Sequence, residues 1–239
     1  EELSVQAAFP KLYALEARYG SLTIGQILGA RDRRKRDEKS KDRARLFTFR
    51  SGMQTFPKAI AKALGDRVFT SARVEKIAIT GQPSTPYFIQ GKRGGMPFHL
   101  TAQALILAIP AHSAAQLLEP LDPALAAKLR GIQYPPVAEV FLGFRKMDLR
   151  RELDGFGFLV PSKEQRKILG TIWSSCLFPG RAPQGYVALT TFVGGSRQPE
   201  LLKKSDEELI SLVKDELREI MGATRSPVYS RVTRWEKAI

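Results

Sequence analysis

Between residues 67 and 110 the apolar side chains recur at every second position, and this period restricts the fold more than any other feature. Four runs show it, at 68–70, 74–79, 87–90 and 98–101. Gly94 and Gly95 mark a turn before the last of them. Since period two places alternate side chains on opposite faces of a strand, these runs predict strands joined by turns.

The sequence pattern predicts strands in two further segments of the first half of the chain. Residues 46–53 alternate and end at Gly52, which predicts a short strand. Residues 104–109 form a continuous apolar run stopped by Pro110, which is typical of a strand buried on both faces.

In the second half of the chain the alternation returns. It predicts strands of one antiparallel sheet at 156–160, 167–173 and 186–193, a strand at 137–144 before them and a last strand at 228–235. Helical spacing predicts helices at 3–29, 57–64, 111–118, 123–129 and 205–221. The last of these is the clearest, because Ser205 and Glu208 have the spacing of a capping box. The fold class is therefore mixed α+β, with helices packed on an antiparallel sheet.

A basic run at 31–45 concentrates the charge of the chain. The whole chain carries a formal net charge of +14, and the run has nine basic and four acidic residues, a net +5. One interpretation is a solvated surface excursion. The other is contact with an anionic membrane surface, because an apolar stripe at Leu22, Ile24, Ile27 and Leu28 precedes the run. Nucleic-acid binding is not expected, since no aromatic residue in the run could stack on bases.

The cysteine and histidine content excludes several kinds of site. Cys176 is the single cysteine, so no disulfide within the chain is possible, and its surroundings predict a buried strand end. With only His99 and His112 beside it, no structural zinc site and no other metal site is expected. A lone cysteine favours a reducing compartment. We expect a cytoplasmic protein without a signal peptide or membrane-spanning helix, with peripheral attachment to the inner face of the cell membrane as the alternative.

Local strings in the chain carry a family resemblance that periodicity does not supply. They lie at 7–22, 49–57, 107–111, 155–161 and 169–196, and the fourth reads Gly-Phe-Gly-Phe-Leu-Val-Pro. In their order and spacing they resemble the middle section of the oxygen-dependent protoporphyrinogen oxidases, flavin enzymes of haem synthesis within the monoamine-oxidase-like superfamily. The resemblance implies FAD as cofactor, oxygen as acceptor and a tetrapyrrole, protoporphyrinogen IX, as substrate.

The resemblance also implies a division of the chain. Residues 1–46 would form a helical, membrane-associated lobe and residues 47–110 a partial FAD-binding domain. Residues 111–239 would form a substrate-binding domain with an antiparallel sheet, returning toward the FAD domain. The Gly-x-Gly-x-x-Gly turn that cradles the flavin pyrophosphate in this family has no counterpart here. We therefore expect an internal fragment that lacks both ends of the family pattern, holds flavin weakly and is inactive alone.

Five residues match positions with roles in the family. Phe156 and Leu159 would hold pyrrole rings, the Gly157 carbonyl would approach the pyrrole nitrogens, and Phe192 would form the opposite wall. These side chains can share one slot only if the strand bends at Gly157, which a glycine permits. The backbone of Val74 would pair with the flavin adenine. The alternative for all of them is a structural role in the core, and no catalytic acid or base is recognisable.

Three other functions remain open at this level. A coproporphyrinogen III oxidase of the same family would act on a substrate with more propionates. An amine oxidase or phytoene-desaturase type of enzyme would share the strand at Val74 but not the Gly-Phe-Gly string. A basic module that binds lipid or nucleic acid would use the run at 31–45, and its binding would depend steeply on salt.

Overall fold

The computed structural model describes residues 5–35, 47–150 and 152–238, with the backbone alone at 29–35. The contacts divide the chain into two compact units, Glu1–Thr48 and Phe49–Ile239. Within the described residues no helix is both long and apolar enough to cross a membrane.

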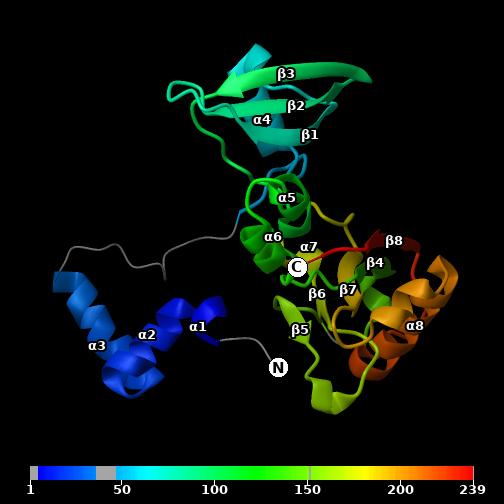
Figure 1. The fold of residues 1–239 in the computed structure, drawn as a ribbon. Coiled ribbons are helices and arrows are strands. Elements are labelled where there is room, and N and C mark those ends of the chain that lie inside the picture. Colours follow the sequence, from blue (N-terminus) through cyan, green and yellow to red (C-terminus); the bar gives the residue numbers. More distant parts are fainter. Residues whose placement is uncertain (1–4, 36–46, 151, 239) are drawn as a thin grey trace. The chain divides into compact units, whose positions relative to one another are not determined.

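The first unit is helical, as its periodicity predicts. It contains α1 (Val5–Ala8), α2 (Pro10–Tyr19) and α3 (Leu22–Lys35), shown in blue in Figure 1. Pro10 lies in the first turn of α2, where its missing N–H costs no hydrogen bond. The helix ends at Gly20, which has a φ of 71° and donates its N–H to the Glu16 carbonyl. Most of the basic run lies outside the described residues, and nothing in the structure bears on its predicted contacts.

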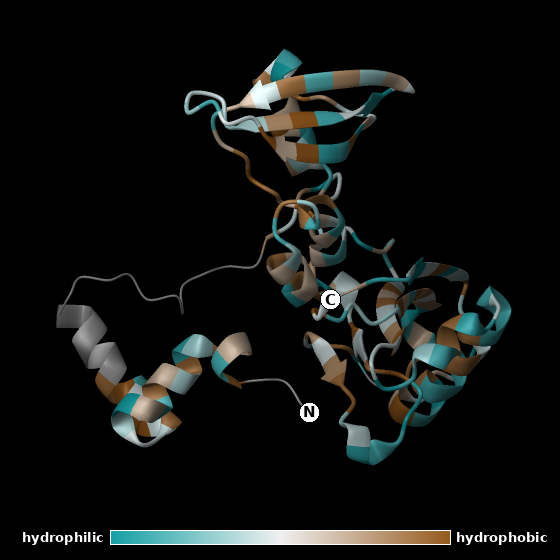
Figure 2. Cartoon of the chain, in the orientation of Figure 1, coloured by the Kyte–Doolittle hydropathy of each residue, from teal (hydrophilic) through white to brown (hydrophobic). Residues whose placement is uncertain are grey.

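The second unit begins with a small antiparallel sheet. It consists of β1 (Ala72–Ile79), β2 (Tyr87–Arg93) and β3 (Met96–Ala102) in the order β1-β2-β3. Helix α4 (Thr55–Leu64) precedes it and leads into the 3-10 turn η2 (Gly65–Arg67). Figure 2 shows the alternation of apolar and polar residues along these strands. Ile77 and Ile89 pair across β1 and β2 and are its buried hydrophobic residues.

Three strands predicted from the sequence do not form. Residues 47–53 are loop and turn, residues 68–70 form no ladder, and residues 104–109 are irregular, with Ile106 90% exposed. A strand exists only when a neighbouring backbone accepts and donates its hydrogen bonds. None of the described strands pairs with these segments, so their apolar content alone does not produce a strand.

Helices α5 (Ala111–Leu118) and α6 (Pro123–Arg130) connect the small sheet to the large one along the chain. They pack through small buried side chains, Ala114, Ala115 and Ala126. Asp122 caps α6 by accepting a hydrogen bond from the Leu125 N–H at 2.9 Å.

A five-stranded sheet forms the centre of the second unit. Its strands are β4 (Val137–Arg145), β5 (Gly157–Leu159), β6 (Gly170–Ile172), β7 (Tyr186–Gly194) and β8 (Tyr229–Trp235). Their order is β5-β6-β7-β4-β8, and every pairing is antiparallel, as predicted. The connections contain η3 (Lys146–Asp148), η4 (Ser162–Glu164), α7 (Ser174–Leu177) and η5 (Pro199–Lys203).

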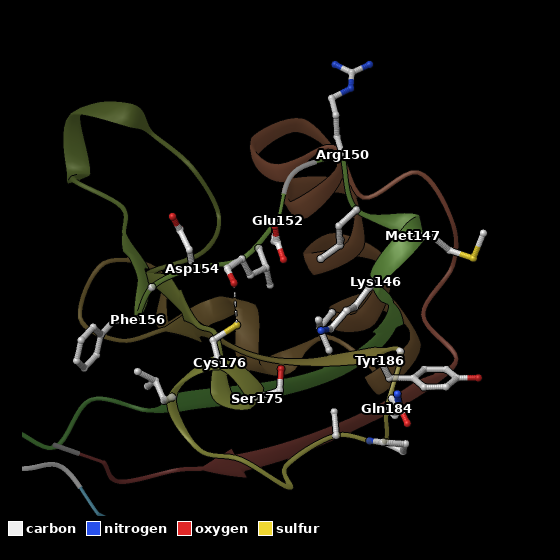
Figure 3. Close-up of a pocket in the computed structure, with 18 residues that line it drawn as sticks. Lys146, Met147, Arg150, Glu152, Asp154, Phe156, Ser175, Cys176, Gln184 and Tyr186 are labelled. Atoms are coloured by element: carbon white, nitrogen blue, oxygen red, sulfur yellow. Dashed lines mark hydrogen bonds between the residues drawn. The ribbon is translucent and has the colours of Figure 1, made fainter.

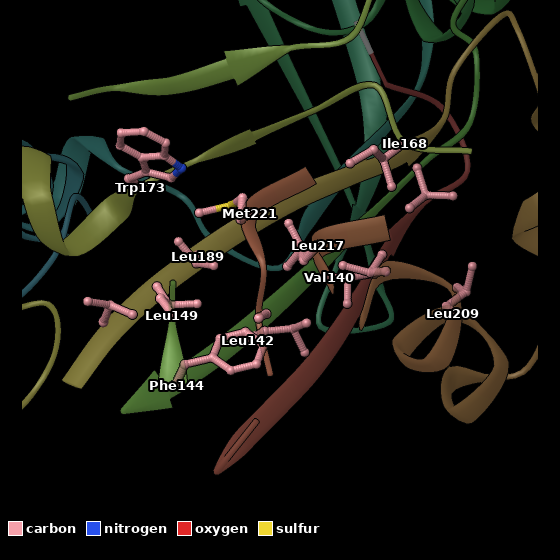
Figure 4. Close-up of a cluster of buried hydrophobic side chains, with 14 of the residues drawn as sticks. Val140, Leu142, Phe144, Leu149, Ile168, Trp173, Leu189, Leu209, Leu217 and Met221 are labelled. Carbon is pink, nitrogen blue, oxygen red and sulfur yellow. The ribbon is translucent and has the colours of Figure 1, made fainter. Parts of the chain in front are cut away.

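Helix α8 (Asp206–Met221) covers one face of the large sheet (Figure 1). It buries four side chains, Leu209, Val213, Leu217 and Met221. They meet the inward side chains of β4 and β7, Val140, Leu142, Phe144 and Leu189, in the cluster shown in Figure 4. This cluster is the main hydrophobic core of the described chain. Between β6 and β7 the buried hydroxyls of Thr171 and Thr191 form a hydrogen bond with each other, with their oxygens 3.0 Å apart.

An ion cluster ties the loop before β6 to α8. Arg166 contacts Glu216 at 3.2 Å and Glu219 at 2.6 Å, and the Lys167 N–H donates to Glu216 at 3.2 Å. The hydrogen bonds to Glu219 and Glu216 raise the pKa of Arg166. The loop is therefore anchored on the side of the sheet that carries the core.

Candidate functional site

The second face of the large sheet is apolar but is left largely uncovered near β5 and β6. Side chains alternate across the sheet, so residues next to the inward Val140, Thr171 and Thr191 point outward. Leu159 and Ile172 lie on this outward face and are 87% and 40% exposed. An exposed group of large apolar side chains on an otherwise packed sheet is a candidate binding surface.

Leu159 and Phe192, two of the predicted residues, lie in one row across three strands. Leu159 pairs with Gly170, and Gly170 pairs with Phe192. Residues directly opposite in an antiparallel ladder share a face. A Cβ at Gly170 would lie 3.0 Å from Leu159 Cδ2, so the leucine side chain lies over this glycine. The structure thus places Leu159 and Phe192 on the same side of the sheet with only a glycine between them.

Sequence reasoning missed two members of this surface. The next outward row contains Ile172 of β6 and Phe141 of β4, which align through Thr190 of β7. Phe141 also meets Tyr229 edge-to-face, with ring centroids 5.9 Å apart. Parity within β6 places Ile172 on the same face as Gly170, but only the register between strands aligns that face with Leu159 and Phe192.

Gly157 explains how the chain enters β5. Its φ is +128°, a backbone conformation that glycine adopts and other residues avoid. A Cβ there would lie 1.9 Å from the Thr171 carbonyl oxygen of β6. After this bend Phe158 packs against the core and Leu159 points to the outward face. The backbone at Gly157 therefore has the irregularity that the predicted slot requires.

Phe156 lies in the wall of a cavity beside the sheet (Figure 3). The cavity has a volume of about 950 Å³, and Phe156 is 63% exposed. Its other walls contain basic and acidic side chains, namely Lys146, Arg150, Glu152 and Asp154. Neither Leu159 nor Phe192 is among the described residues that line it. The structure therefore joins Leu159 and Phe192 in one row but does not place Phe156 in that row.

Cys176 also lines this cavity, which corrects the sequence prediction of a buried strand end. It lies in α7 and is exposed, with its Sγ 3.5 Å from the Leu153 carbonyl oxygen. The helix is held on β7 by two serines. The Ser174 and Thr190 hydroxyls lie 2.9 Å apart, and Ser175 Oγ accepts the Ala188 N–H at 3.0 Å. The strand predicted at 167–173 is shortened to β6 because this helix begins at Ser174.

Val74 lies in β1, at an edge of the small sheet. It pairs with Gly91 of β2, and the register shifts between Val74 and Lys76. The side chain is 36% exposed, so Val74 is not a buried core valine. None of the described strands pairs with the other edge of β1, which leaves backbone groups there for a ligand.

The whole chain, residues 1–239, matches the profile of the family described as flavin containing amine oxidoreductase. The chain belongs to this family. Protoporphyrinogen oxidase 1 of Arabidopsis thaliana chloroplasts is 34% identical over 254 residues, covering 100% of this chain and 47% of that protein. Coproporphyrinogen III oxidase of Bacillus subtilis is 27% identical, covering 100% of this chain and 49% of that protein. The chain thus spans about half the length of the curated relatives it matches.

Solved structures support the same fold. A crystal structure of a candidate protoporphyrinogen oxidase from Exiguobacterium sp. 255-15 superposes with a TM-score of 0.70 at 21% identity. It covers 97% of this chain and 47% of that protein. Cyclohexylamine oxidase of Brevibacterium oxydans gives a TM-score of 0.57 at 19% identity, over 77% of this chain and 38% of that protein. The mixed α+β class with an antiparallel sheet, predicted from the sequence, is confirmed.

Proposed function

We propose that this chain supplies the substrate-binding half of an FAD-dependent oxidase that converts protoporphyrinogen IX to protoporphyrin IX in haem biosynthesis. The uncovered apolar surface formed by Leu159, Ile172 and Phe192 carries the proposal. Relatives named as protoporphyrinogen oxidases in Arabidopsis and tobacco support it. A flat, largely apolar macrocycle is the kind of ligand that a row of leucine, isoleucine and phenylalanine side chains can cover.

This reaction requires little acid or base catalysis by protein side chains. FAD, when bound, would supply the oxidising chemistry with oxygen as the final acceptor, so the residues described here would bind and orient the substrate and exclude water. Leu159 and Phe192 would contact pyrrole rings. The Gly157 carbonyl would accept a hydrogen bond from a pyrrole N–H. Phe156, on the adjoining cavity wall, would contact the edge of the same ligand.

The residues of this chain fit FAD at its adenine end. The unpaired edge of β1 at Val74 offers backbone donors and acceptors of the kind that an adenine ring pairs with. The sequence supplies no glycine-rich turn for the phosphates. We therefore expect the purified chain to hold flavin well below one equivalent. Near-stoichiometric flavin absorbance in a purified sample would contradict this.

Titration with protoporphyrin IX tests the binding surface directly. Quenching of tryptophan fluorescence would report binding, because Trp235 is 55% exposed at the end of β8. Phe192→Ala should raise the Kd about tenfold or more, since a buried aromatic ring contributes roughly 1.5–3 kcal/mol. Ile106→Ala is the control, because Ile106 is an exposed apolar residue that belongs to no strand of the large sheet. Equal Kd values for the two variants would overturn the assignment of the surface.

Coproporphyrinogen III is the second candidate substrate, favoured by the Bacillus subtilis relative of that name. The two substrates differ in the number of propionates rather than in the apolar ring. Parallel titrations with protoporphyrin IX and coproporphyrin III separate them. At least tenfold tighter binding of coproporphyrin III would assign the chain to the second candidate.

We also propose that residues 31–45 contact an anionic membrane from a cytoplasmic location. The net charge of this run and the apolar stripe before it support the proposal. Co-sedimentation with vesicles of phosphatidylcholine alone, or with phosphatidylglycerol added, tests it. Binding should need the anionic lipid, weaken with salt, and disappear when the nine basic residues of the run become glutamine. Binding that ignores lipid charge would contradict it.

A further inference from the structure

The loop between α7 and β7, residues 178–185, is anchored to the large sheet at both ends. It follows directly on α7, which Ser174 and Ser175 hold against β7. At its other end the Gly185 carbonyl accepts the Lys146 N–H at 2.9 Å, just after β4. A long side chain in the middle of this loop can therefore reach away from the sheet while its own backbone stays attached to it.

Arg181 lies in the middle of this loop and contacts a segment 132 residues away in the sequence. Its guanidinium Nη2 donates a hydrogen bond to the Phe49 carbonyl oxygen at 3.0 Å, and both residues are half-buried. The same oxygen accepts the Gly52 N–H at 2.9 Å, which closes the turn 49–52. A hydrogen bond from a guanidinium is charge-assisted, and partial burial limits competition from water. One carbonyl oxygen thus joins this turn to the loop of the large sheet.

The turn 49–52 in turn determines where α4 begins. The Thr55 N–H donates to the Gly52 carbonyl at 3.2 Å, at the start of the helix. The ring of Phe49 stacks on Phe56 of α4, with centroids 6.2 Å apart and planes 10° from parallel. From α4 the chain continues through η2 into β1, which contains Val74. A hold on the Phe49 carbonyl therefore acts directly on the segment that leads into the small sheet.

We infer that Arg181 is a positioning residue that holds the segment leading into the small sheet against the large sheet. It thereby sets the spacing between the β1 edge at Val74 and the apolar surface at Leu159 and Phe192. This inference rests on the proposed function and adds to it the residue that keeps the two proposed binding sites at one distance. Such a residue matters to an oxidase because hydrogen transfer requires cofactor and substrate to be held in near contact.

A second contact also joins the two parts of this unit, because α5 packs against β1. Residues 103–110, which connect β3 to α5, form neither helix nor strand. Packing of α5 on β1 is therefore the rival source of the spacing. The two explanations differ in what they predict for Arg181, since apolar packing is non-directional whereas a hydrogen bond fixes both distance and direction.

The distance between two spin labels tests the inference without any ligand. In a Cys176→Ser background, Lys58→Cys in α4 and Ser211→Cys in α8 provide one exposed labelling position on each side. Pulsed electron-electron double resonance should give one narrow distance distribution for this labelled chain. Arg181→Gln should broaden it and raise the population outside the main distance about tenfold, as expected for loss of one hydrogen bond from a charged donor.

Arg197→Gln is the matched control. Arg197 also donates from its guanidinium to a backbone carbonyl, that of Val160 at 2.7 Å, but both residues adjoin strands of the large sheet. This variant should lose stability to urea as Arg181→Gln does, yet keep the narrow distribution. Arg181→Lys keeps a cationic donor and should restore most of the narrow distribution. Equal broadening in Arg197→Gln would indicate general loosening and overturn the role of Arg181.

Hydrogen exchange of the Gly52 amide gives a local measure of the same contact. Gly52 donates to the carbonyl that Arg181 holds, so Arg181→Gln should accelerate its exchange about tenfold, whereas Arg197→Gln should leave it unchanged. An unchanged label distance in Arg181→Gln would assign the spacing to α5 and overturn the inference.

These outcomes are separate from those of the proposed function, because neither measurement uses a porphyrin or a flavin. If the distances shift as expected but protoporphyrin IX does not bind, the proposed function fails and the contact of Arg181 with the segment before α4 stands. If protoporphyrin IX binds but Arg181→Gln leaves both the distances and the Gly52 exchange unchanged, the role of Arg181 alone is overturned.

Discussion

The two sheets of the unit Phe49–Ile239 share one sequence pattern but differ in how far they are buried. In the three-stranded sheet two large apolar side chains, Ile77 and Ile89, are buried, and the neighbouring α4 buries none. In the five-stranded sheet whole rows of β4 and β7 are buried under α8. Amphipathic helices accompany both sheets. Of α4 and α8, only α8 buries its apolar side against other described residues, namely those of the large sheet.

This difference shows what alternation encodes. A period of two determines which side chains share a face of a strand, and a period of 3.6 does the same for a helix. Whether that face is covered depends on segments distant in the chain. Phe56 and Ile60 of α4 are 55% and 44% exposed although they follow the spacing of a core-facing stripe.

The largest expected effect contrasts one leucine from each region. Leu217→Ala in α8 should lower the free energy of unfolding by roughly 2–5 kcal/mol, because Leu217 is fully buried and a cavity would remain. Leu64→Ala in α4 should cost less than about 1 kcal/mol, since Leu64 is 41% exposed. Urea unfolding followed by circular dichroism measures both. Equal losses would mean that the α4 side is buried in solution.

The fold of the large sheet could be predicted because its strands carry strong local alternation and α8 carries a complete capping box. The failures were at 47–53, 68–70 and 104–109, where the pattern was strand-like but no described strand supplies a partner. For the site, resemblance supplied Leu159 and Phe192, whereas Ile172 and Phe141 follow only from the register between strands. Register is a long-range property, so no local string contains it.

A pair of glycine variants sharpens the contrast between the sheets. Gly95→Ala, in the hairpin turn between β2 and β3, meets open space, so it should cost only the left-handed backbone penalty of roughly 1–2 kcal/mol. Gly157→Ala also drives a Cβ into the Thr171 carbonyl oxygen, so it should cost more and separate β5 from β6.

The measurement for the glycine pair combines stability with protoporphyrin binding. Gly157→Ala should weaken binding together with stability, because Leu159 loses its position over Gly170. Gly95→Ala should change stability alone. If Gly157→Ala bound protoporphyrin IX with unchanged affinity, the bend would have no role in the surface.

A smaller effect concerns how the two amphipathic helices begin. Ser205 caps α8 by accepting the Glu208 N–H at 3.2 Å, whereas α4 has no side-chain cap at Gln54. Ser205→Ala should lower the free energy of unfolding by about 1 kcal/mol. Ser211→Ala, at an exposed position inside α8, is the control and should be neutral or slightly stabilising, since alanine is the better helix former. A loss in Ser211→Ala equal to that in Ser205→Ala would contradict the cap.

The smallest expected effect is a dependence on pH at the same cap. Glu208 accepts the Ser205 N–H at 2.8 Å and lies 3.2 Å from the Lys204 ammonium. The hydrogen bond to Ser205, followed by Lys204, lowers the pKa of Glu208 below its ordinary 4.5. A carboxyl with a depressed pKa stabilises the folded state above its unfolded pKa, and this contribution is lost as pH falls through the lower folded value.

Glu208→Gln keeps an acceptor for Ser205 but removes the charge, so the unmodified chain should have the higher free energy of unfolding at pH 7. That advantage should shrink below pH 4.5. Glu207→Gln, which removes a carboxylate from the same turn without touching the capping box, is the control. An advantage over Glu208→Gln that stayed constant on acidification would place the effect outside the cap and remove this distinction between α8 and α4.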